Sequence, residues 1–125
     1  MMQGELDVSV YYEDTDFSGF VYHANYLKYF DRAREVALGF KNLQDMYAEG
    51  RHFVVKDAKL TYHKPARFGD LLQIKTRFDD SHSVLLACHH EAIRKSTGES
   101  LVSGLITLVL VNERGFPLRL SQSLK

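Results

Sequence analysis

The side chains best suited to chemistry lie in one short stretch, residues 12–26, which carries Asp14, Asp16 and His23. Alternating apolar residues precede this stretch, as in a strand with one buried face. Apolar residues at three- and four-residue intervals follow it, as in an amphipathic helix. Asp16 and His23 therefore bracket a predicted helix N-terminus. A carboxylate there can act as a nucleophile or a general base, and unpaired backbone N–H groups can stabilise negative charge on an oxygen.

These residues also have structural interpretations. An aspartate before a helix is more commonly an N-cap than a catalyst, and we expect Asp14 to be mainly structural. A lone histidine at such a position is commonly a hydrogen-bond partner of the helix end, and Asn25 is expected to be a cap or to support the site from behind. Gly19 would let the chain turn tightly and would let a substrate approach the backbone.

The periodicity around this stretch predicts one strand and one long helix. The strand covers residues 6–12, with Leu6, Val8, Val10 and Tyr12 on its buried face. The helix covers residues 26–40, and its apolar stripe consists of Tyr26, Tyr29, Phe30, Ala33, Val36, Ala37 and Phe40. Gly39 and residues 42–50 are expected to form a short irregular or helical connector.

About four further strands are predicted, over residues 54–62, 72–78, 84–94 and 101–111. In the first of them Val54, Ala58, Leu60 and Tyr62 are assigned to one face, and Lys56 interrupts the pattern. Short turns join these strands, and no second long helix is available for parallel crossovers. We therefore predict an α+β fold in which an antiparallel sheet curls around the helix.

The composition fits one domain that spans residues 1–125. Lys plus Arg total 16 and Asp plus Glu total 16, so the charge does not favour nucleic acid or an anionic membrane as a partner. The longest apolar run, residues 105–111, is much shorter than the roughly 20 residues of a membrane span. The single cysteine, Cys88, cannot form an internal disulfide, which fits a reducing cytoplasm.

No metal site is expected. The sequence has no Cys/His cluster with zinc-ligand spacing, and Cys88 is interpreted as a small buried hydrophobe. His89 and His90 are adjacent on a predicted strand, so their side chains would point to opposite faces.

Two motifs resemble those of a known family. Residues 11–26 read Tyr-Tyr-Glu-Asp-Thr-Asp-x-x-Gly-x-Val-Tyr-His-x-Asn-Tyr, which is similar to the active-site segment of hotdog-fold acyl-CoA thioesterases. The segment looks most like the YbgC-type branch of the 4-hydroxybenzoyl-CoA thioesterase family. The likeness continues in Tyr29-Phe-x-x-Ala-Arg34 and in Tyr62-x-x-Pro65-Ala-Arg67-x-x-Asp70. The resemblance implies a five-stranded antiparallel sheet wrapped around one long central helix.

The same resemblance implies roles for individual residues. Asp16 falls on the family's catalytic carboxylate and His23 on the histidine of the YbgC-type site. The backbone N–H groups near Tyr22 and His23 are expected to polarise the substrate carbonyl. We assign substrate contacts to Gly19, Val21, Tyr22, Asn25 and Arg67. No cofactor is expected.

Positive side chains are candidates for the phosphates of CoA. Arg and Lys suit phosphate, and the candidates are Arg67, Lys64, Arg94 and Lys95. Surface solvation is the alternative for each of them. The sequence differs from many relatives at Phe17, Ser18 and Phe20, where smaller side chains are common, so the shape of the pocket is expected to differ as well.

The implied function is that of an acyl-CoA thioesterase, which hydrolyses a thioester to a free carboxylic acid and CoA. Asp16 would act as nucleophile or general base, and the residues do not decide between these two roles. One alternative is a thioesterase acting on acyl carrier protein. Another is a non-catalytic acyl-CoA binding or regulatory module, which would not require a carboxylate beside an electrophilic carbonyl.

Self-association is expected as well. The outer face of the sheet is predicted to expose more apolar surface than one helix can cover, through Leu85, Ala87, Ile93, Leu105, Val109 and Val111. Members of the family that the chain resembles are homodimers or homotetramers with active sites at the subunit interface.

Overall fold

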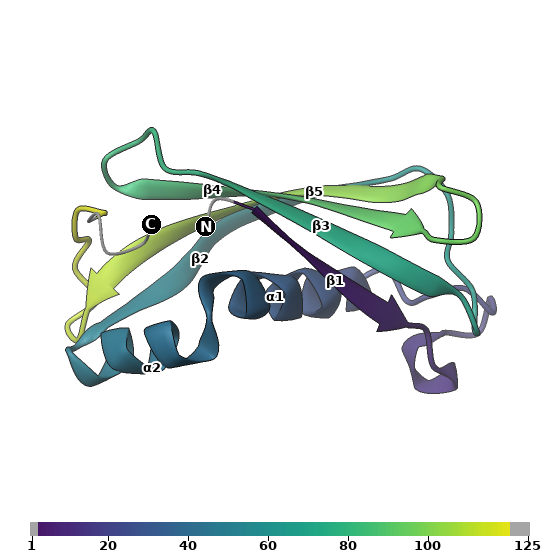
Figure 1. Cartoon of the computed structure of the whole chain (residues 1–125), viewed down its shortest axis with the longest axis horizontal. Helices are drawn as coiled ribbons and strands as arrows, with labels where there is room; N and C mark the ends of the chain where they lie inside the picture. The colour runs from purple at the N-terminus through teal and green to yellow at the C-terminus, as the bar shows by residue number, and fades with distance from the viewer. Residues whose placement is uncertain (1–2, 121–125) are drawn as a thin grey trace.

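The computed structural model describes residues 3–120, which form five strands, two α-helices and one turn of 3₁₀ helix (Figure 1). The strands are β1 (Gln3–Ser9), β2 (Arg51–Tyr62), β3 (Leu71–Asp79), β4 (Leu85–Arg94) and β5 (Ser100–Asn112). The helices are α1 (Asn25–Leu38) and α2 (Phe40–Ala48), and the 3₁₀ turn η1 (Tyr12–Asp14) follows β1. Within these residues, no helix combines the length and the apolar character needed to cross a membrane.

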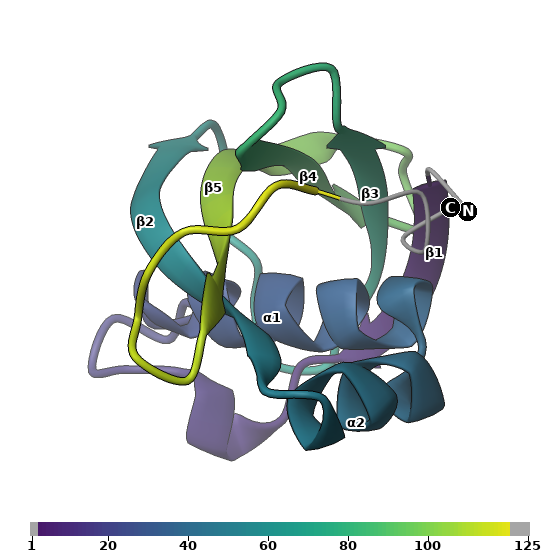
Figure 2. The ribbon, with the colours of Figure 1, turned by 90° about the vertical axis from the view of Figure 1, so that its left-hand side faces the viewer.

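The strands pair in the order β1-β3-β4-β5-β2, and every neighbouring pair is antiparallel. Figure 2 shows the sheet as an open arc around α1, with β1 and β2 at its two edges. The predicted α+β class and the hotdog arrangement of an antiparallel sheet around a helix are confirmed.

The predicted long helix is divided at Gly39. This residue has a φ of 93°, in the left-handed region that a right-handed helix cannot pass through. The Gly39 N–H still donates to the carbonyl of Glu35 and ends α1, while its own carbonyl accepts the N–H of Leu43 and begins α2. The helix that crosses the sheet is therefore α1 alone, with 14 residues.

A close contact between α1 and the sheet occurs where Phe30 meets Gly104 of β5. The Phe30 side chain is completely buried, and a Cβ atom placed on Gly104 would lie 2.7 Å from Cε2 of its ring. The absence of a side chain at Gly104 therefore leaves the space that the Phe30 ring fills.

Most of the predicted apolar stripe of α1 faces this core. The buried members are Tyr26, Tyr29, Phe30 and Ala33. Val36 and Phe40, predicted in the same stripe, are exposed. Val36 lies at the margin of the stripe, and Phe40 lies beyond the break at Gly39.

A β-bulge explains why Lys56 interrupts the pattern of β2. The pairing of β2 with β5 slips between Val55 and Asp57, so that Lys56 is the extra residue. Val55 and Ala58 consequently lie on the same face, because their partners on β5 are two residues apart. Val54 lies on the opposite face, so its predicted grouping with Ala58 was wrong.

Two further expectations are corrected. Tyr12 was predicted on the buried face of a strand, but β1 stops pairing with β3 at Ser9, and Tyr12 lies exposed in η1.

The apolar residues assigned to the outer sheet face are also less exposed than predicted. Val109 and Val111 are buried, and the others are partly buried: Leu85, Ala87, Ile93 and Leu105.

Candidate active site

Asp16 lies in a tight turn between η1 and α1. Its Oδ1 accepts hydrogen bonds from the hydroxyl and, at 2.8 Å, the backbone N–H of Ser18. These two hydrogen bonds hold the pKa of the exposed Asp16 carboxyl below its ordinary value. Gly19 closes the turn, with a φ of 84° and its N–H donated to the carbonyl of Asp16. The carboxylate is therefore ionised at neutral pH, which is the form that acts as nucleophile or base.

Asp14 has the structural role expected of it. Its Oδ2 accepts the N–H of Tyr11 at 2.8 Å, and its Oδ1 accepts the side-chain amide of Asn25 at 3.0 Å. Its carbonyl accepts the N–H of Tyr22 at 2.9 Å. Asp14 thus fastens the start of α1 to η1. The Tyr22 N–H, expected to polarise a carbonyl, is already paired, and that expectation is corrected.

Unpaired backbone donors at the start of α1 include those of His23 and Ala24. Within residues 3–120 neither backbone N–H donates a hydrogen bond, whereas the N–H groups of Val21, Tyr22 and Asn25 are all paired. Ala24 is the N-cap residue, and no side chain caps the helix there. Two N–H groups at the positive end of a helix are therefore available to a ligand oxygen.

Asp16 and His23 line one pocket of about 360 Å³. The rest of its lining comes from the segment leading into α1, from α1 itself and from the loop after β2: Ser18, Phe20, Val21, Tyr26, Tyr62, His63, Lys64 and Pro65. Both predicted catalytic residues and the predicted contact Val21 thus share one wall. The pocket opens to solvent, since Asp16 and His23 are both exposed.

Four predicted contact residues lie outside this lining: Gly19, Tyr22, Asn25 and Arg67. Gly19 shapes the turn that carries Asp16, and Asn25 is buried against Asp14. The ring of Tyr22 lies 4.6 Å from that of His23, and the Arg67 guanidinium lies 5.0 Å from the Phe20 ring centroid. Tyr22 and Arg67 thus pack against His23 and Phe20, two side chains of the lining.

Tyr62, at the end of β2, is a site residue to which sequence reasoning assigned no role. Its hydroxyl donates to the carbonyl of His23 at 2.9 Å, and its ring stands edge-on to the imidazole at 6.5 Å. This hydrogen bond fixes the orientation of the peptide that joins His23 to Ala24. The sequence feature that could have identified Tyr62 is its place at the start of the motif Tyr62-x-x-Pro65-Ala-Arg67-x-x-Asp70. Its partner lies 39 residues away in the chain, so spacing alone could not identify it.

The loop of residues 63–70, between β2 and β3, forms the opposite wall of the pocket and is attached to the helix side through Ala66. The Ala66 carbonyl accepts the N–H of Val21 at 2.9 Å, and the Ala66 N–H donates to the Tyr26 hydroxyl at 3.2 Å. Ala66 is itself completely buried. Any shift of this loop would consequently move the residues next to Asp16 and His23.

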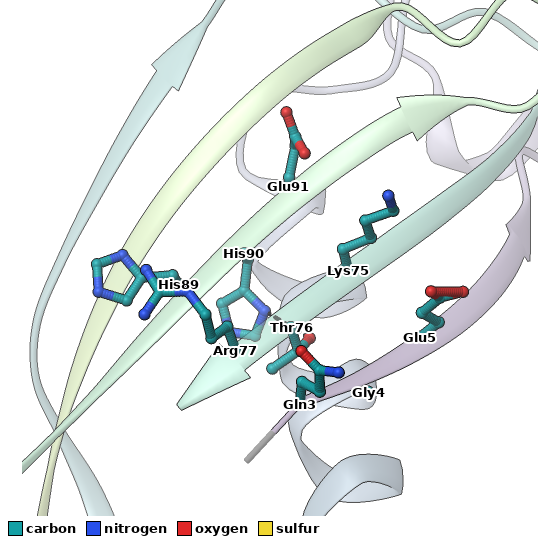
Figure 3. Close-up of a pocket in the computed structure, with 9 residues that line it drawn as sticks. All are labelled: Gln3, Gly4, Glu5, Lys75, Thr76, Arg77, His89, His90 and Glu91. Atoms are coloured by element: carbon teal, nitrogen blue, oxygen red, sulfur yellow. Dashed lines mark hydrogen bonds between the residues drawn. The ribbon is translucent and has the colours of Figure 1, made fainter. Parts of the chain in front are cut away.

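A larger hollow, of about 560 Å³, lies over β1, β3 and β4 (Figure 3). Its lining mixes both signs of charge, with Glu5, Lys75, Arg77, His89 and Glu91 among its members. It contains neither Asp16 nor the start of α1. A carboxylate and an unpaired backbone N–H occur together in the smaller pocket, through Asp16 and His23.

His90, which also borders this hollow, is buried and hydrogen-bonded inside the molecule. Its Nε2 accepts a hydrogen bond from Nη1 of Arg34 at 3.2 Å, because an arginine can only donate. Its Nδ1–H therefore donates to Oγ1 of Thr76 at 3.0 Å, the bond drawn in Figure 3. Within residues 3–120 no group of three or more His, Cys, Asp or Glu side chains is placed to hold a metal ion.

Comparisons with known proteins agree with this geometry. A sequence model of the thioesterase-like superfamily matches residues 10–120. The chain is 42% identical over 82 residues to the acyl-CoA thioesterase YbgC of Helicobacter pylori, a match that covers 66% of this chain and 61% of that protein. The matched part is therefore less than two thirds of that relative's length.

Solved structures give the same assignment of fold. A probable thioesterase from Bartonella henselae superposes with a TM-score of 0.83 at 34% identity, covering 96% of this chain and 98% of the other. The 1,4-dihydroxy-2-naphthoyl-CoA thioesterase Slr0204 of Synechocystis superposes with a TM-score of 0.88 at 22% identity, covering 97% and 91%. At that lower identity the second likeness concerns the fold alone.

Proposed function

Because the chain belongs to the thioesterase-like superfamily, we propose that it is an acyl-CoA thioesterase, which hydrolyses a thioester to a carboxylic acid and free CoA. The observation that carries this proposal is the shared pocket of the Asp16 carboxylate and the unpaired N–H of His23. One group supplies or activates the attacking oxygen, and the other receives the negative charge that develops on the carbonyl oxygen. The relatives named acyl-CoA thioesterases support the choice of substrate class.

Asp16 has two chemically balanced routes. As a nucleophile, its carboxylate oxygen bonds to the acyl carbon, the carbon–sulfur bond breaks, and water then hydrolyses the resulting anhydride. As a general base, Asp16 takes a proton from water while the water oxygen attacks the same carbon. In both routes the leaving group is the CoA thiolate, which then takes up a proton. A free thiol ionises near pH 8.5, so the thiolate leaves without strong acid assistance.

The start of α1 supplies the second part of the mechanism. The N–H of His23 is the donor proposed for the oxyanion, and the Ala24 N–H adds to the positive end of the helix. Loss of one such donor costs roughly 10²- to 10³-fold in turnover in other enzymes. The His23 imidazole, beside the same pocket, is proposed to orient the attacking water or the thioester carbonyl.

A second copy of the chain is proposed to cover this open site. The outer edge of β2 has no strand partner within residues 3–120, and the strand carries exposed Val54 and Val55. Antiparallel pairing of two such edges would give a homodimer, and two dimers would give the homotetramer. Exclusion of water from the pocket would strengthen the hydrogen bonds to the oxyanion. With its single cysteine buried, we assign the protein to the cytoplasm.

The test is the release of free thiol from a panel of short-chain, long-chain and aromatic acyl-CoAs, with matching acyl carrier protein thioesters and with binding measured in parallel. Turnover of at least one CoA ester is expected. Turnover of carrier-protein thioesters alone would transfer the proposal to that substrate class. Binding of acyl-CoA with no turnover of any ester would contradict the enzyme assignment and favour a binding or regulatory module.

A further inference from the structure

Arg94, at the end of β4, is a largely buried cation that the proposed reaction does not use. Its side chain is 16% exposed, so its charge is mostly removed from water. It was a candidate for binding the phosphates of CoA, but its guanidinium group is already occupied by three acceptors from other parts of the chain. A buried charge with this many partners usually holds those partners in place, since each would otherwise lose a charge-assisted hydrogen bond.

The three acceptors of Arg94 come from both ends of one loop and from a neighbouring turn. Nη2 donates to the carbonyl of Pro65 at 2.9 Å, and Nε donates to Oδ2 of Asp70 at 3.1 Å. Nη1 donates to Oε1 of Glu99, in the turn before β5, at 2.8 Å. Only a planar guanidinium presents donors in this divergent arrangement, so a lysine could not make all three contacts.

The loop held in this way is the wall of the Asp16 pocket, residues 63–70. Asp70 also accepts the N–H of Arg67, which closes the loop on itself. Lys64, in the pocket lining, forms an ion pair with Glu99 and so reaches Arg94 through a shared carboxylate. The loop is thus attached at its start, its middle and its end.

A continuous series of contacts then leads from Arg94 to the reactive groups. Arg94 holds the Pro65 carbonyl, and the next residue, Ala66, is hydrogen-bonded to Val21 and Tyr26 on the helix side of the pocket. Val21 lies two residues before His23, whose N–H is the proposed oxyanion donor. Displacement of reacting groups by about 1 Å can cost 10²-fold in rate, so a distant anchor of this kind matters for turnover.

We propose that Arg94 is a positioning residue, which holds the loop of residues 63–70 so that the Asp16 pocket keeps its reactive geometry. The expected effect on kcat rests on the proposed thioesterase function. The expected effect on the loop of residues 63–70 rests only on the contacts of Arg94. It assigns Arg94 no contact with the substrate, and it replaces the expectation that this residue binds phosphate.

The substitution Arg94→Met tests the proposal, because it keeps the length of the side chain and removes every donor. We expect kcat to fall about 10- to 100-fold while KM changes much less, at a temperature where the variant is fully folded. Amide hydrogens of residues 63–70 should exchange faster than in the wild type. The matched control is Arg114→Met, which makes the same substitution at an exposed position in the turn after β5, outside the lining of the Asp16 pocket.

Several outcomes would overturn the proposal. A folded Arg94→Met protein with wild-type kcat would do so, as would an increase in KM alone, which would indicate that Arg94 binds CoA. If Arg94→Met does not fold, Asp70→Ala takes its place, because it removes the oxygen that accepts the Nε hydrogen bond and leaves Arg94 itself unchanged. Wild-type kcat in that variant would equally contradict the proposal. If the wild type hydrolyses no thioester, the proposed function fails, and unchanged exchange of residues 63–70 in the variant would then separately refute the positioning role.

Discussion

At the scale of single residues, the site separates groups that react from groups that hold them. Asp14 and Asp16 are only two positions apart, yet the Asp14 carboxylate uses one oxygen to cap η1 and the other to bind Asn25 of α1, while Asp16 keeps Oδ2 unpaired within residues 3–120. The same division applies at the start of α1. The N–H of Tyr22 is paired with Asp14, and the N–H of His23 is left for a substrate oxygen.

Tyr62 belongs to the holding group, which gives a first prediction. Tyr62→Phe removes only the hydroxyl that fixes the His23 carbonyl. The expected result is a drop in kcat of about 2- to 10-fold, which corresponds to the net value of one hydrogen bond. Steady-state kinetics with the best acyl-CoA would measure it. Tyr47→Phe, at an exposed tyrosine of α2, is the control and should be silent. Equal kcat in Tyr62→Phe and wild type would show that the hydroxyl does not position the peptide.

At the scale of elements, α1 connects the core under the sheet with the site. Phe30 fills the space over Gly104 of β5, and the start of the same helix carries His23, whose carbonyl accepts a hydrogen bond from Tyr62 of β2. His90, the partner of Gly104 across β4 and β5, stacks on the same ring, with centroids 4.8 Å apart. The contact therefore connects packing of the core with the geometry of the pocket.

A methyl group at Gly104 should disturb this contact. Gly104→Ala is expected to lower the free energy of unfolding by about 1–3 kcal/mol, because the Phe30 ring is completely buried and has little room to move. Urea denaturation would measure the loss. The double variant Gly104→Ala with Phe30→Leu should recover part of it. Additive losses in the double variant would mean that the two residues do not compete for the same space.

His90 predicts how stability depends on pH. Burial, followed by the nearby charges of Arg34 and His89, lowers its pKa from 6.5 to about 3. Between these two pH values the unfolded chain binds a proton at His90 that the folded chain does not. The contribution of the neutral His90 to the free energy of unfolding is therefore fully present above pH 6.5 and is lost as the pH falls towards 3. Because a single proton is involved, the free energy of unfolding falls by at most about 1.4 kcal/mol per pH unit.

Denaturation between pH 6.5 and 4.5, above the titration of most carboxylates, would test this expectation. The wild type should lose stability over that interval. His90→Gln, although less stable at neutral pH, should lose less of its remaining stability. An identical slope in both proteins would contradict a buried, neutral His90.

The sequence predicted most of these elements and missed features that depend on partners distant in the chain. Periodicity located α1 and all five strands, because each has one face turned towards a single core. It could not place the bulge at Lys56, which is visible only in the register of β2 against β5. Gly39 marked the end of the helix, but its positive φ and the start of α2 one residue later became clear only in the structure.

The candidate site was predictable to a similar extent. Asp16, His23 and Val21 do share a pocket, because they lie close together in the chain around one turn. The opposite wall comes from the loop after β2, about 40 residues later, and nothing in local spacing indicates which of its side chains turn inwards. The same limit applies to Arg94, whose three acceptors lie on both sides of it in the sequence.

At the scale of the whole molecule, several exposed apolar side chains gather on the edge strand β2 and on the two helices. They include Val54 and Val55 on β2, Leu27 and Val36 on α1, and Phe40 and Tyr47 on α2. This distribution favours a partner along the β2 edge and the outward surface of the helices. The Asp16 pocket adjoins the end of β2, so a copy of the chain paired there would lie next to it.

The unpaired edge of β2 gives a prediction about the oligomeric state of the protein. Val55→Asp should convert the proposed dimer into monomers and reduce kcat, because a charge at an unpaired strand edge disfavours edge-to-edge pairing and leaves the pocket open. Light scattering after size-exclusion chromatography would measure the mass. Phe116→Asp, at an exposed residue after β5, should leave it unchanged. A wild-type protein that is monomeric and fully active would contradict this prediction.

The most direct test of the central claim is the rate of thiol release by Asp16→Asn, compared with the wild type and with Glu13→Gln. Both substitutions remove one exposed carboxylate from the same segment, but only Asp16 lines the pocket. The account predicts that Asp16→Asn retains its fold and binds acyl-CoA but loses at least about 10²-fold in kcat, while Glu13→Gln keeps the wild-type rate. A folded Asp16→Asn protein that turns over acyl-CoA at the wild-type rate would contradict the assignment of this carboxylate as the reactive group.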